Sequence, residues 1–369
     1  MRVGIVAGTR PEGIKVAPLV LALRAAGHEA VLAATGQHRE MLTQVLAAFD
    51  LRPDADLGLQ NHGLTLAELT AETMRRADAL LAAERFDALV VQGDTTAAFV
   101  GALAAFYREV PVVHLEAGLR TRDLAQPWPE EANRQLVSRI AALHLAPSEG
   151  AAANLRAERV GGTVVQTGNT VIDALLHVRG RCLPWETPAL AELDHDGALA
   201  GDLVLVTLHR RESWGDGLAR VAAALRRLAL ERPGLRVVFP VHRNPVVRAA
   251  VGPLLEGLAN VTVLEPVPYP DLVKLLDRCR LVLTDSGGLQ EEAPALGKPV
   301  LVCRDTTERP EAVQAGGARL VGTDTERIAA AVAHLLDHTE AYAAMAGGHN
   351  PYGDGDAAPR AVAAIEALG

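Results

Sequence analysis

Two glycine-containing loops in this sequence have the composition of anion-binding turns. The first, residues 8–15, follows a short apolar run and precedes a helix-like stretch, and it carries Arg10 and Lys15. Backbone N–H groups at the start of a helix, together with these two cations, favour a diphosphate or sugar contact. The spacing approaches a P-loop, but Ile14 precedes the lysine and no Ser or Thr follows it to hold magnesium. A nucleoside triphosphatase is therefore disfavoured, and a plain turn with exposed charges is the alternative.

The second loop, residues 284–292, reads as strand, glycine turn and helix. The N–H groups that would face a diphosphate there belong to Ser286, Gly287 and Gly288. Glu292 lies about one helical turn beyond them, where a carboxylate could accept hydrogen bonds from both hydroxyls of a ribose. The side chains of adjacent helical residues point in directions about 100° apart, so the two cannot both face a ligand. We therefore expect Glu292 to point toward the nucleotide and its neighbour Glu291 to contribute little to binding.

Carboxylates form a third group in the first half of the chain. Asp94 and Glu116 follow apolar runs, and Glu130 lies in the segment 127–131, PWPEE. Carboxylates at the ends of apolar strands can serve as general acids or bases. Taken singly, each is more often structural, for instance as a helix cap.

Histidines and possible metal ligands give weaker signals. His209 and His242 close two expected strands of the second half, where isolated histidines are commonly core or rim residues. No pair has the spacing of metal ligands, and residues 54–56, DAD, lie in a Pro- and Gly-rich loop. A GxGxxG fingerprint is absent from the sequence. We therefore expect neither a metal nor a nicotinamide cofactor.

These residues require a scaffold of parallel strands. Short β-branched runs alternate with Ala- and Leu-rich stretches throughout, which predicts an α/β protein. The expected strands are 2–8, 29–35, 88–93, 110–116, 143–147, 163–168, 203–209, 235–241, 261–265, 280–285, 299–303 and 318–321. Residues 177–202 lack strand signal, so we place a domain change between about 170 and 200. Ligands bind beyond the carboxyl ends of such strands, so we expect two doubly wound domains facing each other across a cleft.

Composition limits the possible partners. The 369 residues carry a net charge of −9, and no basic patch or basic amphipathic stretch suits a nucleic acid or a membrane surface. Cys182, Cys279 and Cys303 are far apart, which disfavours a disulfide framework. The first residues have no secretory apolar segment, so we expect a cytoplasmic protein.

Several motifs in order along the chain resemble one family, the bacterial non-hydrolysing UDP-N-acetylglucosamine 2-epimerases. They are GTRPEGIKVAPL (8–19), GQHREML (36–42), GDTT (93–96), HLEAGLRTRDLAQPWPEEANR (114–134), TGNTVIDALL (167–176), HRRESWG (209–215), PVHRNP (240–245), TDSGGLQEEAPALGKPVL (284–301), RDTTERPEAV (304–313) and NPYGDG (350–355). The resemblance covers the chain from residue 1 to about 368.

The resemblance implies a GT-B fold with two Rossmann-like domains, residues 1–170 and 171–355, and a final helix, 356–368, that returns to the first. It also implies a homodimer that interconverts UDP-N-acetylglucosamine and UDP-N-acetylmannosamine for cell-surface polysaccharides. UDP would be eliminated to leave 2-acetamidoglucal, and re-addition after protonation of the opposite face would invert C2. Such a reaction needs no nicotinamide.

Matching each motif position implies site residues. The catalytic set would be Asp94, Glu116, Glu130 and His209. The substrate-binding set would be Arg10, Lys15, His242, Ser286, Gly287, Gly288, Glu292 and Arg309. Gln37, His38 and Arg39 resemble a segment where some relatives bind a second UDP-N-acetylglucosamine as activator. Which carboxylate serves which face of C2 is left open.

The chain departs from the family pattern at two positions. Gln92 stands before GDTT where histidine is common, and Leu208 stands before HRRE where glycine or alanine is common. Residues 60–63 also lack an arginine that some regulated relatives have. Three alternatives stay open: a glycosyltransferase of the same fold, a hydrolysing epimerase that releases N-acetylmannosamine, and a nucleotide-sugar sensor without catalysis.

Overall fold

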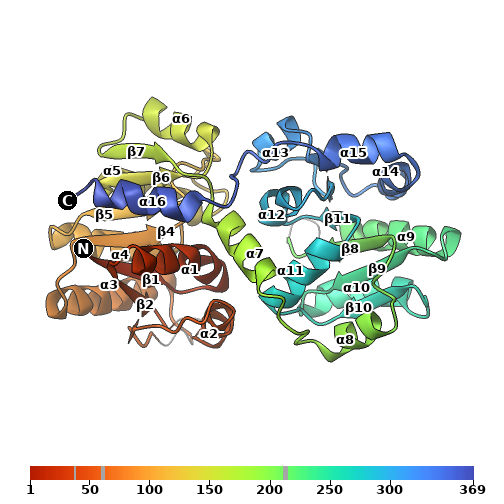
Figure 1. The fold of residues 1–369 in the computed structure, drawn as a ribbon, viewed down its shortest axis with the longest axis horizontal. Helices are drawn as coiled ribbons and strands as arrows, with labels where there is room; N and C mark the ends of the chain where they lie inside the picture. Colours follow the sequence, from red (N-terminus) through yellow and green to blue (C-terminus); the bar gives the residue numbers. More distant parts are fainter. Residues whose placement is uncertain (37–38, 60–62, 211–214) are drawn as a thin grey trace. The chain divides into compact units, whose positions relative to one another are not determined.

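The computed structural model describes residues 1–36, 39–59, 63–210 and 215–369. The chain forms two compact units: Met1–His177 with Tyr352–Gly369, and Val178–Pro351. Each unit contains a parallel sheet with helices between successive strands (Figure 1). No helix among the described residues is both long and apolar enough to cross a membrane.

The first unit is built on a seven-stranded sheet of order β3-β2-β1-β4-β5-β6-β7. Its strands are β1 (Arg2–Ala7), β2 (Glu29–Ala34), β3 (Ala55–Asp56), β4 (Ala88–Gln92), β5 (Val112–Leu115), β6 (Leu143–Ala146) and β7 (Thr163–Gln166). Its helices are α1 (Arg10–Ala25), α2 (Arg39–Ala47), α3 (Leu66–Ala83), α4 (Thr96–Tyr107), α5 (Glu130–Ile140), α6 (Glu149–Ala157), the first part of α7 (Thr170–Gly180) and α16 (Ala357–Glu366). Every residue of β4 and β5 is buried, as expected for central parallel strands covered on both faces.

The second unit has a six-stranded sheet of order β10-β9-β8-β11-β12-β13. Its strands are β8 (Leu203–Thr207), β9 (Arg236–Pro240), β10 (Val261–Leu264), β11 (Leu281–Thr284), β12 (Val300–Val302) and β13 (Ala318–Leu320). Its helices after α7 are α8 (Pro188–His195), α9 (Asp216–Glu231), α10 (Pro245–Leu255), α11 (Tyr269–Arg278), α12 (Leu289–Ala295), α13 (Pro310–Gln314), α14 (Thr325–Asp337) and α15 (Thr339–Ala346). Helix α9 buries Leu218, Val221, Leu225 and Leu228, a helical spacing that places one apolar face on the core.

The strand pattern was read correctly from the sequence, with one omission. Each of the twelve predicted stretches contains an observed strand. The two-residue edge strand β3 was missed because it lies in a loop without an apolar run. It pairs in parallel with β2, Ala55 opposite Ala33 and Asp56 opposite Ala34. Residues 54–56 are therefore structural here: Asp54 pairs with Arg24 and Asp56 with Arg39.

The strand order reverses direction at one place in each sheet. In the first unit β1 lies between β2 and β4, and in the second β8 lies between β9 and β11. The loops after neighbouring strands separate at such a switch point, which opens a crevice at the carboxyl edge of a sheet. A ligand site is therefore expected at the loops that follow β1, β4 and β5, and at those that follow β8 and β11.

Helix α16 packs against α1 within the first unit. The Asp173 carboxylate on α7 accepts hydrogen bonds from the N–H groups of Ala357 (3.3 Å) and Ala358 (2.7 Å). An acceptor at the first turn of a helix satisfies N–H groups that have no partner within the helix. This contact fixes the C-terminal helix on the unit that contains the N-terminus (Figure 1).

Candidate active site

Glu12 joins the loops that follow β1 and β4. Its Oε2 accepts hydrogen bonds from the backbone N–H groups of Gly8 (2.9 Å) and Thr9 (2.7 Å), and its Oε1 accepts one from the Thr95 hydroxyl (2.7 Å). The side chain is only 2 % exposed. Burial raises the pKa of the Glu12 carboxyl, while the hydrogen bonds from Thr95, Gly8 and Thr9 act in the opposite direction. The loop that carries Arg10 and the loop that carries Asp94 are thus tied together.

Glu116, the first residue after β5, is held by three side-chain donors. Lys15 Nζ lies 2.5 Å from its Oε1, Asn169 Nδ2 lies 3.0 Å from the same oxygen, and Gln92 Nε2 lies 2.5 Å from its Oε2. Only 9 % of Glu116 is exposed. A carboxylate that accepts from donors on both oxygens has one orientation fixed by its surroundings.

The backbone at Glu116 is strained. Its φ of 62° lies in the left-handed region, which costs a non-glycine residue roughly 1–3 kcal/mol. Such a conformation persists only where neighbouring contacts determine it, and it is common at functional sites. Here the three donors to the Glu116 carboxylate stabilise this conformation. The strained backbone therefore supports a functional role for this carboxylate.

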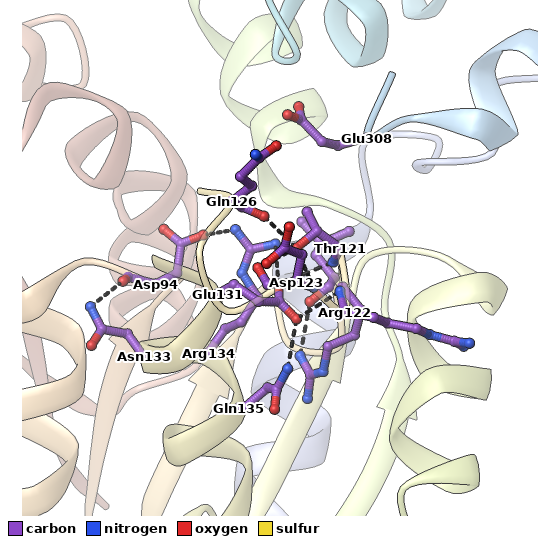
Figure 2. A network of polar contacts seen from close by, with 12 residues as sticks. Asp94, Thr121, Arg122, Asp123, Gln126, Glu131, Asn133, Arg134, Gln135 and Glu308 are labelled. Carbon is purple, nitrogen blue, oxygen red and sulfur yellow. Dashed lines mark hydrogen bonds and ion pairs between the residues drawn. The ribbon is translucent and has the colours of Figure 1, made fainter. Parts of the chain in front are cut away.

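Asp94 is held through both its backbone and its side chain by helix α5. Asn133 Nδ2 donates to the Asp94 carbonyl oxygen at 2.9 Å, and Arg134 Nη2 forms an ion pair with Asp94 Oδ2 (Figure 2). The preceding residue, Gly93, has a φ of 71° that turns the chain out of β4. Two consecutive residues of α5 therefore set the position of the carboxylate.

A buried histidine supports the same turn. His114 Nε2 lies 2.8 Å from the carbonyl oxygen of Gly93, which requires this ring nitrogen to carry the hydrogen. Burial lowers the pKa of His114 to about 3, against the weaker opposing effect of the Gly93 hydrogen bond. The ring is therefore neutral at working pH and acts as a fixed donor rather than as an acid or base.

Glu131 fastens the loop before α5. This fully buried carboxylate accepts hydrogen bonds from the backbone N–H groups of Thr121 (3.0 Å) and Arg122 (3.1 Å) and from Gln135 Nε2 (2.8 Å) (Figure 2). Its neighbour Glu130 differs: Oε2 of Glu130 is buried and has no hydrogen-bond partner among the described residues. Of the adjacent pair, Glu131 is the structural carboxylate and Glu130 is the one with unused acceptor capacity.

In the second unit, Asp285 organises the loop after β8. Its carboxylate is fully buried and accepts from the backbone N–H groups of His209 (3.0 Å) and Arg210 (2.9 Å). Its Oδ1 also lies 3.1 Å from His209 Nδ1. Burial by itself would raise the pKa of Asp285, but the hydrogen bonds and charge of His209 lower it below its usual value. The Asp285 contact therefore orients the imidazole of His209.

Two guanidinium groups flank the glycine turn after β11. A Cβ placed on Gly287 would lie 3.7 Å from Arg210 Nη2 and 3.9 Å from Arg309 Cζ. Arg309 pairs with Glu291, and Arg210 lies 3.3 Å from Glu308 Oε2. Absence of a side chain at Gly287 thus keeps the space between two cations open, as a bound anion requires.

The sequence was also compared with known protein families and with individual proteins. A family model described as UDP-N-acetylglucosamine 2-epimerase matches residues 21–366. The chain belongs to the UDP-N-acetylglucosamine 2-epimerase family. A protein of Ralstonia nicotianae named probable UDP-N-acetylglucosamine 2-epimerase is 51 % identical, with 99 % of each chain covered. A UDP-N-acetylglucosamine 2-epimerase of Salmonella typhimurium is 47 % identical, covering 99 % of this chain and 98 % of that one.

A solved structure of the family gives the same picture. The UDP-GlcNAc 2-epimerase of Neisseria meningitidis, bound to UDP-GlcNAc, has a TM-score of 0.90 and 42 % identity, with all of both chains covered. The predicted fold class, two Rossmann-like α/β domains of the GT-B type, is confirmed by this likeness and by the two parallel sheets.

The structure of this epimerase-family chain groups the predicted site residues by unit. In the first unit Lys15 and Glu116 are in direct contact, Asp94 follows the end of β4, and Glu130 is the first residue of α5. His209, Ser286, Gly287, Gly288, Glu292 and Arg309 belong to the second unit, at or near the ends of β8 and β11. Arg10 is the first residue of α1.

Glu291 and Glu292 were expected to differ, but both are buried, 1 % and 6 % exposed. Both are buried because α12 is covered on two sides: Glu291 pairs with Arg309, and Glu292 accepts from the Tyr269 hydroxyl at 3.1 Å. The expected difference between the two in nucleotide binding stays a prediction. His242 is exposed, and its Nδ1 accepts the Asn244 N–H at 3.2 Å.

The segment compared with an activator site is described only in part. Gln37 and His38 lie outside the described residues. Arg39 begins α2 and lies 2.5 Å from Asp56 Oδ2. The assignment of these three residues stays a prediction.

Several residues that hold the predicted site residues in place were given no role in the sequence-based prediction. They are Glu12, Gln92, His114, Glu131, Arg134, Asn169 and Asp285, which hold the predicted residues in place. Most lie within the quoted motifs, so their place in those strings was a usable signal. Their partners, however, can be far away in the sequence, 83 residues for the contact between Glu12 and Thr95.

Proposed function

We propose that this chain is a non-hydrolysing epimerase that interconverts UDP-N-acetylglucosamine and UDP-N-acetylmannosamine. The observation that carries the proposal is the pair of fixed carboxylates, Asp94 and Glu116, at the carboxyl ends of neighbouring strands β4 and β5. Proton removal and delivery at a carbon need such groups, whereas transfer of a sugar to an acceptor does not require several of them. The name of the family and the sugar nucleotide bound in the Neisseria structure are consistent with this substrate.

The proposed reaction proceeds by elimination and re-addition. A carboxylate removes the proton from C2 of the sugar, the C2–H electron pair forms the C1=C2 double bond, and the C1–O pair leaves with UDP. A proton then reaches C2 from the opposite face, and the UDP oxygen attacks C1. The sugar keeps its oxidation level throughout, so the reaction needs no hydride acceptor.

The roles follow the motif positions named above. Asp94, Glu116, Glu130 and His209 make up the proposed catalytic set, which removes, delivers or stabilises charge around C1 and C2. The substrate-binding set is Arg10, Lys15, His242, Ser286, Gly287, Gly288, Glu292 and Arg309. Stabilisation of the departing diphosphate is the second requirement, and the guanidinium groups of Arg210 and Arg309 beside Gly287 support it.

We infer that the product supplies UDP-N-acetylmannosamine for cell-surface polysaccharides and that the active form is a homodimer. Residues 37–39 are proposed to bind a second UDP-N-acetylglucosamine as activator. Size-exclusion chromatography with light scattering tests the dimer, and a sigmoidal dependence of rate on substrate tests the activator.

Proton NMR in deuterium oxide tests the central proposal. Incubation with UDP-N-acetylglucosamine, without added NAD and with a chelator present, should yield UDP-N-acetylmannosamine that carries deuterium at C2. Retention of the original hydrogen would refute proton removal by a side chain. Release of free N-acetylmannosamine would favour the hydrolysing type, and a requirement for an acceptor would favour a glycosyltransferase.

A further inference from the structure

We propose that Gln92 and Asn169 are positioning residues that set the orientation of the Glu116 carboxylate for its proton-transfer step. The inference rests on the proposed epimerase function. Neither amide belongs to the catalytic or substrate-binding sets assigned above, and both act on the reaction only through Glu116.

The sheet brings the two amides to opposite oxygens of the same carboxylate. Gln92 is the last residue of β4 and pairs in register with Leu115, so its side chain lies beside the residue that follows β5. Its Nε2 donates to Glu116 Oε2 at 2.5 Å. Asn169, which follows β7, donates from Nδ2 to Oε1 at 3.0 Å. Each oxygen therefore receives one neutral amide donor.

Both amides are themselves fixed. Gln92 is 3 % exposed and Asn169 is 2 % exposed. Asn169 Oδ1 accepts the Val171 N–H at 3.2 Å at the start of α7, and the Asn169 N–H donates to the Tyr352 carbonyl oxygen at 2.6 Å. Burial limits the rotamers of Gln92, and the two further hydrogen bonds of Asn169 hold its position, so each donor has a defined place relative to Glu116.

The amides and Lys15 have different tasks. Lys15 supplies charge and is partly exposed, with 16 % of its side chain accessible. Amide groups do not titrate, so the orientation they impose on Glu116 is the same at every working pH. The left-handed backbone at Glu116 needs such external support, since the residue would otherwise relax to a commoner conformation. Misplacement of a reacting group by about 1 Å can cost about a hundredfold in rate.

The test compares variants at Gln92 in the full-length protein. Gln92→Met keeps the length of the side chain and removes the donor, so kcat for epimerisation should fall about tenfold to a hundredfold while KM changes less than about threefold. Gln92→His restores an N–H donor and should recover most of the lost rate. Thr73→Val removes a buried hydroxyl that bonds only within α3 in the described structure, and it controls for a loss of stability.

A double-mutant cycle separates positioning from a general structural effect. Glu116→Gln combined with Gln92→Met should be no slower than Glu116→Gln, because Gln92 has nothing further to position once the carboxylate is lost. Additive losses would overturn the inference. If Gln92→Met does not fold, Asn169→Asp serves instead: it keeps the acceptor for Val171, replaces the donor to Glu116 by an oxygen, and should lower kcat in the same way.

The outcomes for the two proposals differ. A wild-type protein that turns over, with Gln92→Met and Asn169→Asp equally fast, overturns the positioning role and leaves the epimerase proposal intact. A wild-type protein that shows no interconversion overturns the epimerase proposal, and the positioning role falls with it. Loss of kcat in Gln92→Met with recovery in Gln92→His supports the inference.

Discussion

The adjacent acids Glu130 and Glu131 should respond in opposite ways to the same substitution. Both lie in the first turn of α5, so replacement of either by glutamine removes one negative charge from the same helix terminus. Glu131 accepts hydrogen bonds from the backbone N–H groups of Thr121 and Arg122, whereas Glu130 accepts none from the backbone of the described residues. We therefore predict that Glu131→Gln releases the loop before α5 and that Glu130→Gln does not.

The magnitude follows from the contacts. A glutamine at 131 has one acceptor oxygen, so its NH₂ must face either the Thr121 or the Arg122 N–H, donor against donor. Loss of one hydrogen bond to a buried charged acceptor costs about 1.5–3 kcal/mol. The open form of the loop should become about tenfold to more than a hundredfold more populated. Glu130→Gln changes no such bond, and its free energy of unfolding should stay within about 0.5 kcal/mol of wild type.

Native-state proteolysis measures this difference directly. Trypsin cleavage after Arg122, followed by mass spectrometry, should be faster in Glu131→Gln in proportion to the open population, when opening is fast relative to cleavage. Glu130→Gln should be cleaved at the wild-type rate and yet lose about 10²–10⁴-fold in epimerase rate. Equal cleavage of the two variants would refute the assignment of Glu131 as the residue that holds the loop.

Glu292→Ala should weaken UDP binding by about 1–3 kcal/mol in calorimetry, the cost of lost hydrogen bonds to a charged acceptor, and unchanged affinity would remove Glu292 from the nucleotide site. Because burial raises the pKa of Cys279 to about 12 and that of the buried Cys303 as well, a thiol reagent should titrate only the exposed Cys182 in the native protein and all three in denaturant. Folding lowers the pKa of Asp285, so the ionised carboxylate stabilises the folded state above pH 4, and this contribution is lost as the pH falls through the folded-state pKa. The difference in melting temperature between wild type and Asp285→Asn should therefore be largest near pH 7 and shrink at acid pH. A difference that stays constant with pH would contradict this.

The sequence determined the scaffold of this protein because the relevant information is local. Strands buried on both faces need continuous apolar runs, and stretches such as 88–93 and 203–209 could be read without knowing their neighbours. Edge strand β3 was missed because two residues at a sheet edge need no such run. The motifs also placed Asp94, Glu116 and His209 after strands, where parallel sheets bind ligands.

The tertiary structure decided which of these side chains are held, and by what. Glu12 belongs to a loop that could be read as a turn with exposed charges, yet it is buried between two loops because β1 and β4 are neighbours in the sheet. Glu291 was expected to contribute little, yet it is buried and pairs with Arg309, because a loop from a later strand covers that side of α12. Helical periodicity predicts which residues share one face of a helix. The order of the strands decides how many faces of that helix are covered by other segments. Contacts between residues far apart in sequence therefore had to come from the structure.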